Sequence, residues 1–329
     1  MQGEDIVGKT VLVVLPVEER HKKLLESAYP EGNFIYCQKN YQEYLEKAQI
    51  LIGNIPAKEI QLGKNLEFIQ TNNAGVEEYT VPGVIPPNVK FCCASGCYGL
   101  AISEYMLGCV LSLIKHLNRY RINQQNHDWK DEGHVTSIYG SKTLVIGLGD
   151  IGSEFAQKMH LLGSQVTGIR RHTADKPDWL ETIYPLDKLD DIIGDFDIVA
   201  LSIPNTSATA HLMDLNRLKK MKKSAILINV GRGNAIVTDD LCKALNEGII
   251  AGAAVDVTDP EPLPKDNPLW DAPNMIITPH TSGQYHLPET FERIVRLAAE
   301  NLKAFITGQP LKSIVDFNTG YRAFETRKN

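Results

Sequence analysis

Short apolar runs alternate with helical stretches along the chain, and this alternation predicts an α/β protein with parallel sheets. The first apolar run, residues 9–16, is predicted to form a buried strand, and a helical pattern follows it and ends near Ala28. Two further runs, residues 48–55 and 66–71, are the next strands predicted in this opening region. We therefore expect a small α/β domain over about the first 98 residues.

A long helix is predicted from about residue 100 to residue 125. Met106, Val110, Leu113 and Leu117 recur at spacings of four, three and four, which places them on one face of a helix. The position of this helix before a second α/β block suggests that it bridges two domains. An ordinary core helix is the alternative.

The second α/β block has the clearer pattern. Residues 142–146 predict a strand, residues 150–162 a helix that stops at Gly163, and residues 165–169 the next strand. Four more strands are predicted over residues 196–202, 225–230, 250–257 and 275–278. Six strands with intervening helices predict the doubly wound parallel sheet of a dinucleotide-binding domain.

The chain ends with a predicted amphipathic helix over residues 289–305 and a short apolar segment over 314–316. We expect this end to pack against the first domain and make it discontinuous. The expected architecture is two Rossmann-like or flavodoxin-like α/β domains with a cleft between them. Residues 1–98 and 289–329 would form the substrate-binding domain, and residues 99–288 the dinucleotide-binding domain.

The composition of the chain excludes several classes of function. The 329 residues are 43% hydrophobic and 22% charged, as in an ordinary globular protein, and the net charge of −6 argues against nucleic acid as a partner. No apolar run approaches the roughly 20 residues that span a bilayer, and the acidic N-terminus does not resemble a signal peptide. Six cysteines in a chain of this length indicate reduced packing residues. We expect a cytoplasmic protein with no membrane association and no metal.

A glycine-rich turn follows the strand at residues 142–146: Gly147-Leu148-Gly149-Asp150-Ile151-Gly152. Gly147 permits the tight turn, Gly149 lets the backbone approach a pyrophosphate, and Gly152 lets the helix pack closely on the strand. The helix that starts near Asp150 then presents free N–H groups to the phosphates. A purely structural turn is the alternative.

The residues after the next strand indicate which nucleotide binds. NAD sites carry an acidic residue about 20 residues beyond the first glycine. Arg170 stands there instead, 170 − 147 = 23 residues beyond Gly147, and Arg171 and His172 follow it. Guanidinium groups attract the 2′-phosphate that an acid would repel. The sequence therefore predicts that the cofactor is NADP, and NAD is the second choice. The alternative is that these residues form a solvated basic loop and that an acid elsewhere binds NAD.

Three residues in the last third of the chain indicate a reaction. Arg232 lies in Asn229-Val230-Gly231-Arg232-Gly233, Glu261 in a proline-rich segment at 259–264, and His280 in Thr278-Pro279-His280-Thr281-Ser282-Gly283. Taken singly they could be a surface arginine, a turn glutamate and a core histidine. Behind a nucleotide site, their order suggests hydride transfer to a small oxo acid. The arginine would clamp a carboxylate, the histidine would exchange a proton, and the glutamate would hold that histidine protonated.

These motifs together resemble the D-isomer-specific 2-hydroxyacid dehydrogenase family, and the resemblance covers essentially the whole chain. The matching segments are residues 72–76, 147–152, 229–233, 255–257, 260–263 and 279–283. The loop sequence is similar to those of hydroxypyruvate and glyoxylate reductases. The resemblance implies a substrate-binding domain interrupted by a coenzyme domain, an active site in the cleft, and a homodimer.

The resemblance also implies residue roles. Arg232 would pair with the substrate carboxylate and carbonyl oxygen, His280 would be the acid in reduction, and Glu261 would support its imidazolium form. Backbone amides of Ala74 and Gly75 would contact the carboxylate, and Asp256 would hold the nicotinamide carboxamide. Further cofactor contacts would come from Asp150, Ile151, Pro204, Val230 and His280. Two alternative functions are a nucleotide-sensing scaffold on the same fold and a formate-type dehydrogenase. The intact Arg, Glu and His set disfavours the first, and the Glu261–His280 pair disfavours the second.

Overall fold

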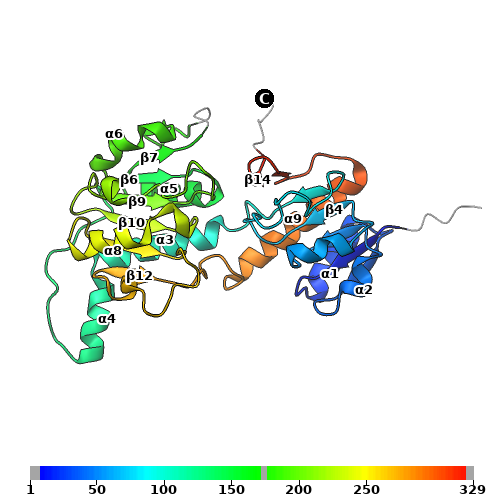
Figure 1. Cartoon of the computed structure of the whole chain (residues 1–329), viewed down its shortest axis with the longest axis horizontal. Coiled ribbons are helices and arrows are strands. Elements are labelled where there is room, and N and C mark those ends of the chain that lie inside the picture. The colour runs from blue at the N-terminus through cyan, green and yellow to red at the C-terminus, as the bar shows by residue number, and fades with distance from the viewer. Residues whose placement is uncertain (1–7, 172–175, 324–329) are drawn as a thin grey trace, which may run out of the picture. The chain divides into compact units, whose positions relative to one another are not determined.

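The computed structural model describes residues 8–171 and 176–323, and contacts divide the chain into two compact units. Unit 1 is made of Met1–Tyr98 and Leu287–Asn329, and unit 2 is Gly99–His286. Both units contain a parallel sheet with helices packed against it, so the prediction of an α/β protein is confirmed (Figure 1).

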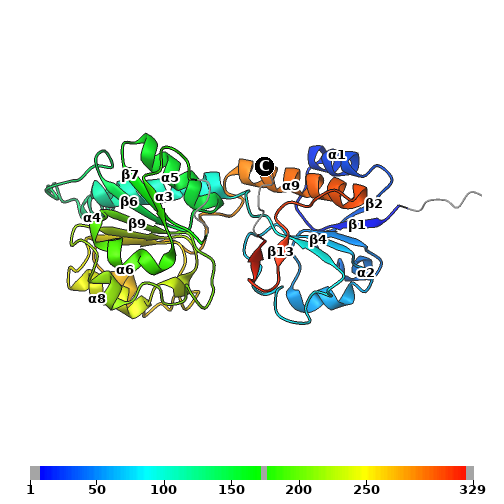
Figure 2. The ribbon, with the colours of Figure 1, turned by 90° about the horizontal axis from the view of Figure 1, so that it is seen from above.

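Unit 1 is built on a five-stranded sheet of order β2-β1-β3-β4-β5, in which every pairing is parallel. The strands are β1 (Thr10–Val13), β2 (Asn33–Tyr36), β3 (Ile50–Ile52), β4 (Phe68–Gln70) and β5 (Lys90–Cys92). Helices α1 (Glu19–Ala28) and α9 (Pro288–Thr307) cover one face, and the short helix α2 (Gln42–Leu45) lies on the other (Figure 2).

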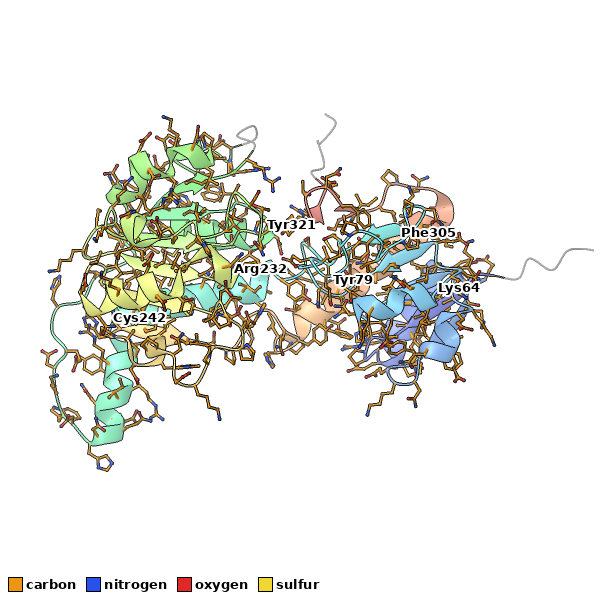
Figure 3. The ribbon with its side chains drawn as sticks, viewed as in Figure 1. Lys64, Tyr79, Arg232, Cys242, Phe305 and Tyr321 are labelled. Carbon is orange, nitrogen blue, oxygen red and sulfur yellow. The ribbon has the colours of Figure 1, made fainter. Side chains whose placement is uncertain are left out.

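Helix α9 attaches the end of the chain to this sheet. The predicted apolar stripe is real, because Ile294, Val295, Ala298 and Leu302 are almost fully buried. The ring of Phe305, labelled in Figure 3, stacks on Phe68 of β4 with 4.9 Å between centroids. Beyond α9, β13 (Val315–Asp316) and β14 (Tyr321–Arg322) form an antiparallel pair, and Ile314 forms a bridge with Cys92 of β5.

Unit 2 is built on a seven-stranded parallel sheet of order β12-β11-β10-β9-β6-β7-β8. The strands are β6 (Lys142–Ile146), β7 (Gln165–Ile169), β8 (Thr182–Tyr184), β9 (Ile198–Leu201), β10 (Ile226–Asn229), β11 (Gly252–Val255) and β12 (Met275–Ile277). The order runs outward from β6 in both directions, which is the topological switch of a doubly wound fold.

Helices cover both faces of the second sheet. Helices α3 (Gly99–Ile114) and α5 (Asp150–Leu161) lie on one face, and α6 (Leu189–Ile192) and α8 (Thr238–Asn246) on the other (Figure 2). Helix α7 (Leu215–Leu218) contacts α8. As the sequence predicts, α5 stops at Gly163, which adopts φ +86° and donates its N–H to the carbonyl of His160 at 2.8 Å.

The prediction of one continuous helix from residue 100 to 125 is wrong. Helix α3 ends at Ile114, and α4 (Leu117–Asn126) continues after a bend of 65°. His116 takes a left-handed conformation, φ +57°, which no helix interior tolerates. Leu113 is buried and Leu117 is 55% exposed, so the apolar face stops at the bend. Among the described residues no single helix is long and apolar enough to cross a membrane, while the bent pair α3–α4 passes that test by length and composition.

The sequence did not predict three strands of the two parallel sheets: β2, β5 and β8. Each lies at an edge of its sheet, and β2 and β8 contain no fully buried residue. An edge strand covered on one side only does not need a continuous apolar run, so its sequence carries a weak signal. The second sheet therefore has seven strands where six were predicted.

Candidate functional site

The predicted site residues of unit 2 follow the carboxyl ends of neighbouring strands. In spatial order along the sheet these are Arg170 after β7, Gly147 after β6, Pro204 after β9, Val230 and Arg232 after β10, Asp256 after β11, and His280 after β12. Parallel strands end at the same edge of a sheet, so the fold gathers along one edge residues that are up to 280 − 147 = 133 positions apart in sequence. The switch at β6 places the nucleotide position beside the turns after β6 and β9.

The glycine-rich turn after β6 is tightly constrained. Gly147 has φ +99°, and its carbonyl accepts a hydrogen bond from Ser202 Oγ at 2.7 Å. A Cβ on Gly147 would lie 2.6 Å from the carbonyl oxygen of Ser202, and one on Gly152 would lie 1.9 Å from the carbonyl oxygen of Gly147. Neither position has room for a side chain. Helix α5 therefore starts in close contact with the turn.

Gly149 differs from its neighbours, because a Cβ there would meet no described atom within 4 Å. Gly149 is the N-cap of α5, and it supplies no side chain to cap the first turn. The carboxylate of Asp150 accepts the N–H of Gly99 at 2.8 Å, and Ile151 is half-buried in the first turn. An open space beside helix N–H groups suits a pyrophosphate, so these residues fit a dinucleotide.

Arg170 follows β7 directly, and its N–H donates to the carbonyl of Tyr184 in β8 at 3.1 Å. Its side chain is half-buried, and Arg171 is exposed. His172, the third basic residue noted in the sequence, lies outside the described residues. The end of the second strand of the nucleotide fold therefore carries guanidinium groups at the position where NAD sites place an acid.

Arg232 is held by the turn after β10, where Figure 3 labels it. The side-chain amide of Asn229 donates to the carbonyl of Arg232 at 2.9 Å, and its oxygen accepts the N–H of Gly231 at 3.0 Å. A Cβ on Gly231 would lie 2.6 Å from the carbonyl oxygen of Ile203, and one on Gly233 would lie 1.9 Å from that of Thr258. The turns after β9, β10 and β11 thus press together and fix the backbone of the arginine.

His280 and Glu261 form a hydrogen-bonded pair. Nδ1 of His280 lies 2.6 Å from Oε1 of Glu261, and the two side chains are 51% and 41% exposed. His280 has φ +52°, and its N–H donates to the carbonyl of Asp256 at 2.8 Å. A left-handed conformation is uncommon for a residue other than glycine and persists where the surroundings enforce it. The imidazole is therefore positioned at both its ring and its backbone.

Asp256 is buried beneath the histidine loop. It is 2% exposed, and its carboxylate accepts four hydrogen bonds. The donors are Thr278 Oγ1 at 2.6 Å, the N–H of Thr281 at 3.0 Å, and the N–H and Oγ of Ser282 at 3.1 and 2.5 Å. Its contact with a nicotinamide carboxamide stays a prediction. The contacts observed hold the loop that carries His280.

The same network continues into α3 through a contact that the sequence did not predict. The hydroxyl of Tyr105 lies 2.7 Å from Thr278 Oγ1, and burial raises the pKa of Tyr105 above its usual range. Burial also raises the pKa of the neighbouring Cys109 to about 11. Both groups therefore stay neutral near pH 7. Spacing could place Tyr105 on the helix, but only the fold brings it to Thr278.

In unit 1, Ala74 and Gly75 lie in the loop after β4. Asn54, after β3, accepts the N–H of Asn72 at 2.9 Å, and the carbonyl of Asn73 accepts the N–H of Ala94 at 2.8 Å. Ala74 and Gly75 are half-buried, between the exposed Asn73 and the buried Val76. The loop is therefore tied to the ends of both adjacent strands. Among the residues described, no group of three or more His, Cys, Asp or Glu could hold a metal ion.

Comparisons with known proteins agree with this arrangement. Residues 107–282 match the model of the D-isomer-specific 2-hydroxyacid dehydrogenase NAD-binding domain. The glyoxylate reductase of Thermofilum pendens is 31% identical over 275 residues, which cover 81% of this chain and 80% of that one. A crystal structure of a D-isomer-specific 2-hydroxyacid dehydrogenase family protein from Aeromonas salmonicida has a TM-score of 0.83 at 32% identity, covering 94% of this chain and 99% of that chain.

A more distant structure shares the fold. The NADPH-dependent glyoxylate/hydroxypyruvate reductase of Sinorhizobium meliloti, solved with NADP and sulfate, has a TM-score of 0.81 at 21% identity, covering 95% of this chain and 100% of that chain. The family model, the relatives above 30% identity and the two-unit fold agree. The chain belongs to the D-isomer-specific 2-hydroxyacid dehydrogenase family of NAD(P)-dependent oxidoreductases.

Proposed function

We propose that the protein reduces a small 2-oxo acid to a D-2-hydroxy acid and prefers NADPH as the reductant. The observation that carries this proposal is the Glu261–His280 pair, 2.6 Å apart, in the unit that also carries the glycine-rich turn. Unit 1 would bind the substrate and unit 2 the coenzyme. Family membership supports the reaction class, and relatives named glyoxylate reductase support a short oxo acid.

His280 is the proton donor in this proposal. Glu261 accepts a hydrogen bond from Nδ1, which fixes the orientation of the ring. The other ring nitrogen, Nε2, then gives its proton to the substrate carbonyl oxygen. The bound dinucleotide supplies the hydride that reaches the carbonyl carbon. In the oxidative direction, His280 takes the proton back.

Arg232 is the carboxylate clamp. Its planar guanidinium suits a 2-oxo acid, in which the carboxylate and the carbonyl oxygen lie side by side. The fixed turn after β10 supports this role, because an arginine with a rigid backbone loses less freedom when it binds. The backbone amides of Ala74 and Gly75, in unit 1, would also contact the substrate carboxylate.

Arg170 and Arg171 would bind the 2′-phosphate of NADPH. We expect the wild-type protein to favour NADPH over NADH by roughly tenfold to a thousandfold in kcat/KM, since each charge-assisted bond adds about 1.5–3 kcal/mol, partly offset by desolvation. Arg170→Asp should erase or reverse this preference and leave kcat at saturating cofactor largely intact. Arg121→Asp, on the exposed side of α4, is the matched control. Equal kcat/KM for both cofactors in the wild type would contradict the assignment.

The reaction itself is tested by a panel of 2-oxo acids. Glyoxylate, hydroxypyruvate, pyruvate and longer 2-oxo acids should each be assayed with NADPH and NADH, and the chirality of the product determined. We expect NADPH consumption and a D-product. A nucleotide-sensing scaffold would bind NADPH without turnover, and a formate-type dehydrogenase would oxidise formate instead.

We further propose that the protein is a homodimer in the cytoplasm. The homodimer rests on the family resemblance, and sedimentation of the purified protein tests it. None of the six cysteines, all of which lie in the described part of the chain, forms a disulfide, as suits a reducing compartment.

A further inference from the structure

Unit 1 contains a cavity of about 410 Å³ that the proposed reaction does not use. It is lined by the loop after β5, by one face of α9, and by the segment that leads through β13 to β14, where Figure 3 labels Tyr321. Its charged lining residues are Arg293, Arg296, Glu300, Lys312 and Arg322. Pockets for small ligands are typically about 300–1,000 Å³, so the cavity has the size of a small-molecule site.

The charge of this cavity is opposite to that of the whole chain, which is −6. Four of its described lining residues are cationic and one is a carboxylate. Arg293 and Arg296 both pair with Glu289, at 3.3 and 2.6 Å, and Lys312 pairs with Glu300 at 2.8 Å. Four cations against these two carboxylates leave a net charge of +2. Such a concentration of positive charge attracts an anion.

The cations stand on backbone that is already fixed. Asn301, 1% exposed, accepts the N–H of Lys312 at 2.8 Å and donates to its carbonyl at 2.9 Å. Arg322 is held by antiparallel pairing with Val315, and Arg293 and Arg296 lie within α9. A ligand that binds here therefore orders side chains and not loops, which lowers the entropic cost of binding.

The buried wall of the cavity is also built from hydrogen bonds. Ser313 Oγ donates to the carbonyl of Ser95 at 2.8 Å, and the carbonyl of Ser313 accepts the N–H of Cys93 at 3.0 Å. Gly96 has φ +103°, and a Cβ there would meet no described atom within 4 Å. The loop after β5 thus leaves space in front of the cations.

This loop lies beside the proposed carboxylate-binding loop of the same unit. The N–H of Ala94, next to Ser95, donates to the carbonyl of Asn73, which precedes Ala74. Strands β4 and β5, which carry the two loops, are neighbours and parallel. An anion in the cavity would therefore be close to the segment that we assign to the substrate.

We propose that this cavity is an anion site for a phosphate or carboxylate group of a small molecule. The group has two possible sources: the second acidic group of an extended 2-oxo acid, or a separate anionic effector. The site itself does not depend on the proposed reductase activity. Its assignment to the substrate does.

Isothermal titration calorimetry with inorganic phosphate, at constant ionic strength, tests the site directly. We expect saturable binding to the wild-type protein. The double variant Arg296→Gln/Lys312→Gln should bind phosphate at least about tenfold more weakly, because it loses two charged donors. Both side chains are more than half exposed, so the fold should persist, and a thermal unfolding curve checks this.

Glu300→Gln gives a second test in the opposite direction. It removes a carboxylate from the lining without removing a cation, so phosphate should bind more tightly. Lys303→Gln, an exposed position on α9 that does not line the cavity, is the matched control and should not change the affinity. Absence of phosphate binding to the wild type, or equal affinity in all four proteins, would overturn the proposal.

Kinetics then distinguish the two sources. If the cavity takes the second acidic group of the substrate, Arg296→Gln/Lys312→Gln should raise KM for 2-oxoglutarate and leave KM for pyruvate unchanged. If it takes an effector, the two KM values should stay in the same ratio, and phosphate should change the rate with pyruvate in the wild type only. If the protein reduced neither acid, the proposed function would fail, and calorimetry would still decide the anion site.

Discussion

Two carboxylates in unit 2 contact His280 or the loop that carries it, and one of them is exposed while the other is buried. Glu261 is 41% exposed in its side chain and contacts the imidazole ring. Asp256 is 2% exposed and contacts the backbone and hydroxyl groups on either side of the histidine. When the charge on a neighbouring group changes during a reaction, the energetic cost to an exposed carboxylate is small, because water screens the interaction between the charges. A buried carboxylate with four donors is fixed in position, because removing a donor would leave a buried oxygen without its hydrogen bond.

The comparison suggests a division of labour. Glu261 and His280 would carry the chemistry, and Asp256 would hold the loop in the conformation that allows it. The left-handed φ of His280 agrees with this division, because a strained residue needs a rigid support. Substitutions that separate activity from stability test this division.

The largest effect is expected for His280→Ala. Loss of the proton donor should lower kcat/KM for 2-oxo acid reduction by about 10³–10⁴-fold. The thermal unfolding temperature should change little, because the side chain is half exposed. NADPH binding, followed by fluorescence, should remain measurable. His286→Ala, at an exposed position in the same unit, is the control. Turnover in His280→Ala comparable to the control would remove histidine from the mechanism.

Arg232→Ala should have the next largest effect. Without the clamp, kcat/KM should fall by about 10²–10³-fold, a loss of roughly 3–4 kcal/mol of transition-state stabilisation. The kcat/KM of Arg232→Lys should lie between those of Arg232→Ala and the wild type, because lysine keeps the charge and loses the planar fork. Steady-state kinetics with one oxo acid measures all three proteins. Near-normal kcat/KM in Arg232→Ala would show that another group binds the carboxylate.

Asp256→Asn should change stability as well as activity. The new amide would direct a donor at Thr278, Thr281 or Ser282, all of which are donors to this carboxylate. We expect the free energy of unfolding to fall by about 1.5–3 kcal/mol, the range for a hydrogen bond to a charged group. Calorimetric unfolding measures this, with the exposed Asp271→Asn as control. A variant as stable as the control would contradict the structural role.

The sequence predicted one side of this comparison much better than the other. Arg232, Glu261 and His280 lie in short motifs next to predicted strands, so their types and order were sufficient to suggest a reaction. The glycines of the turn after β6 could be predicted equally well, because each is required by local steric constraints. Asp256 was singled out as well, but for a cofactor contact. Its four donors lie in the segment that follows β12. The sequence alone does not show that β12 pairs with β11 and brings these donors to Asp256.

Features that depend on tertiary contact were missed for the same reason. The cavity in unit 1 brings together Ser95, Arg293, Lys312 and Arg322, which no motif links. Tyr105 meets Thr278 only because α3 packs against the sheet of unit 2. The bend at His116 was hidden because the apolar spacing continues through it to Leu117, which is exposed. Periodicity reports a local pattern and does not report which partner covers it.

The most direct test of the division of labour is a paired measurement of kcat/KM for oxo acid reduction and of the thermal unfolding temperature in the wild type, Glu261→Gln and Asp256→Asn. Glu261→Gln keeps the shape of the side chain and removes the negative charge beside the ring of His280. It should lower kcat/KM and leave the unfolding temperature close to that of the wild type, because the Glu261 side chain is 41% exposed. Asp256→Asn should lower the unfolding temperature, because the buried carboxylate accepts four hydrogen bonds. Wild-type kcat/KM in Glu261→Gln, or a loss of stability in Glu261→Gln as large as that in Asp256→Asn, would contradict the account.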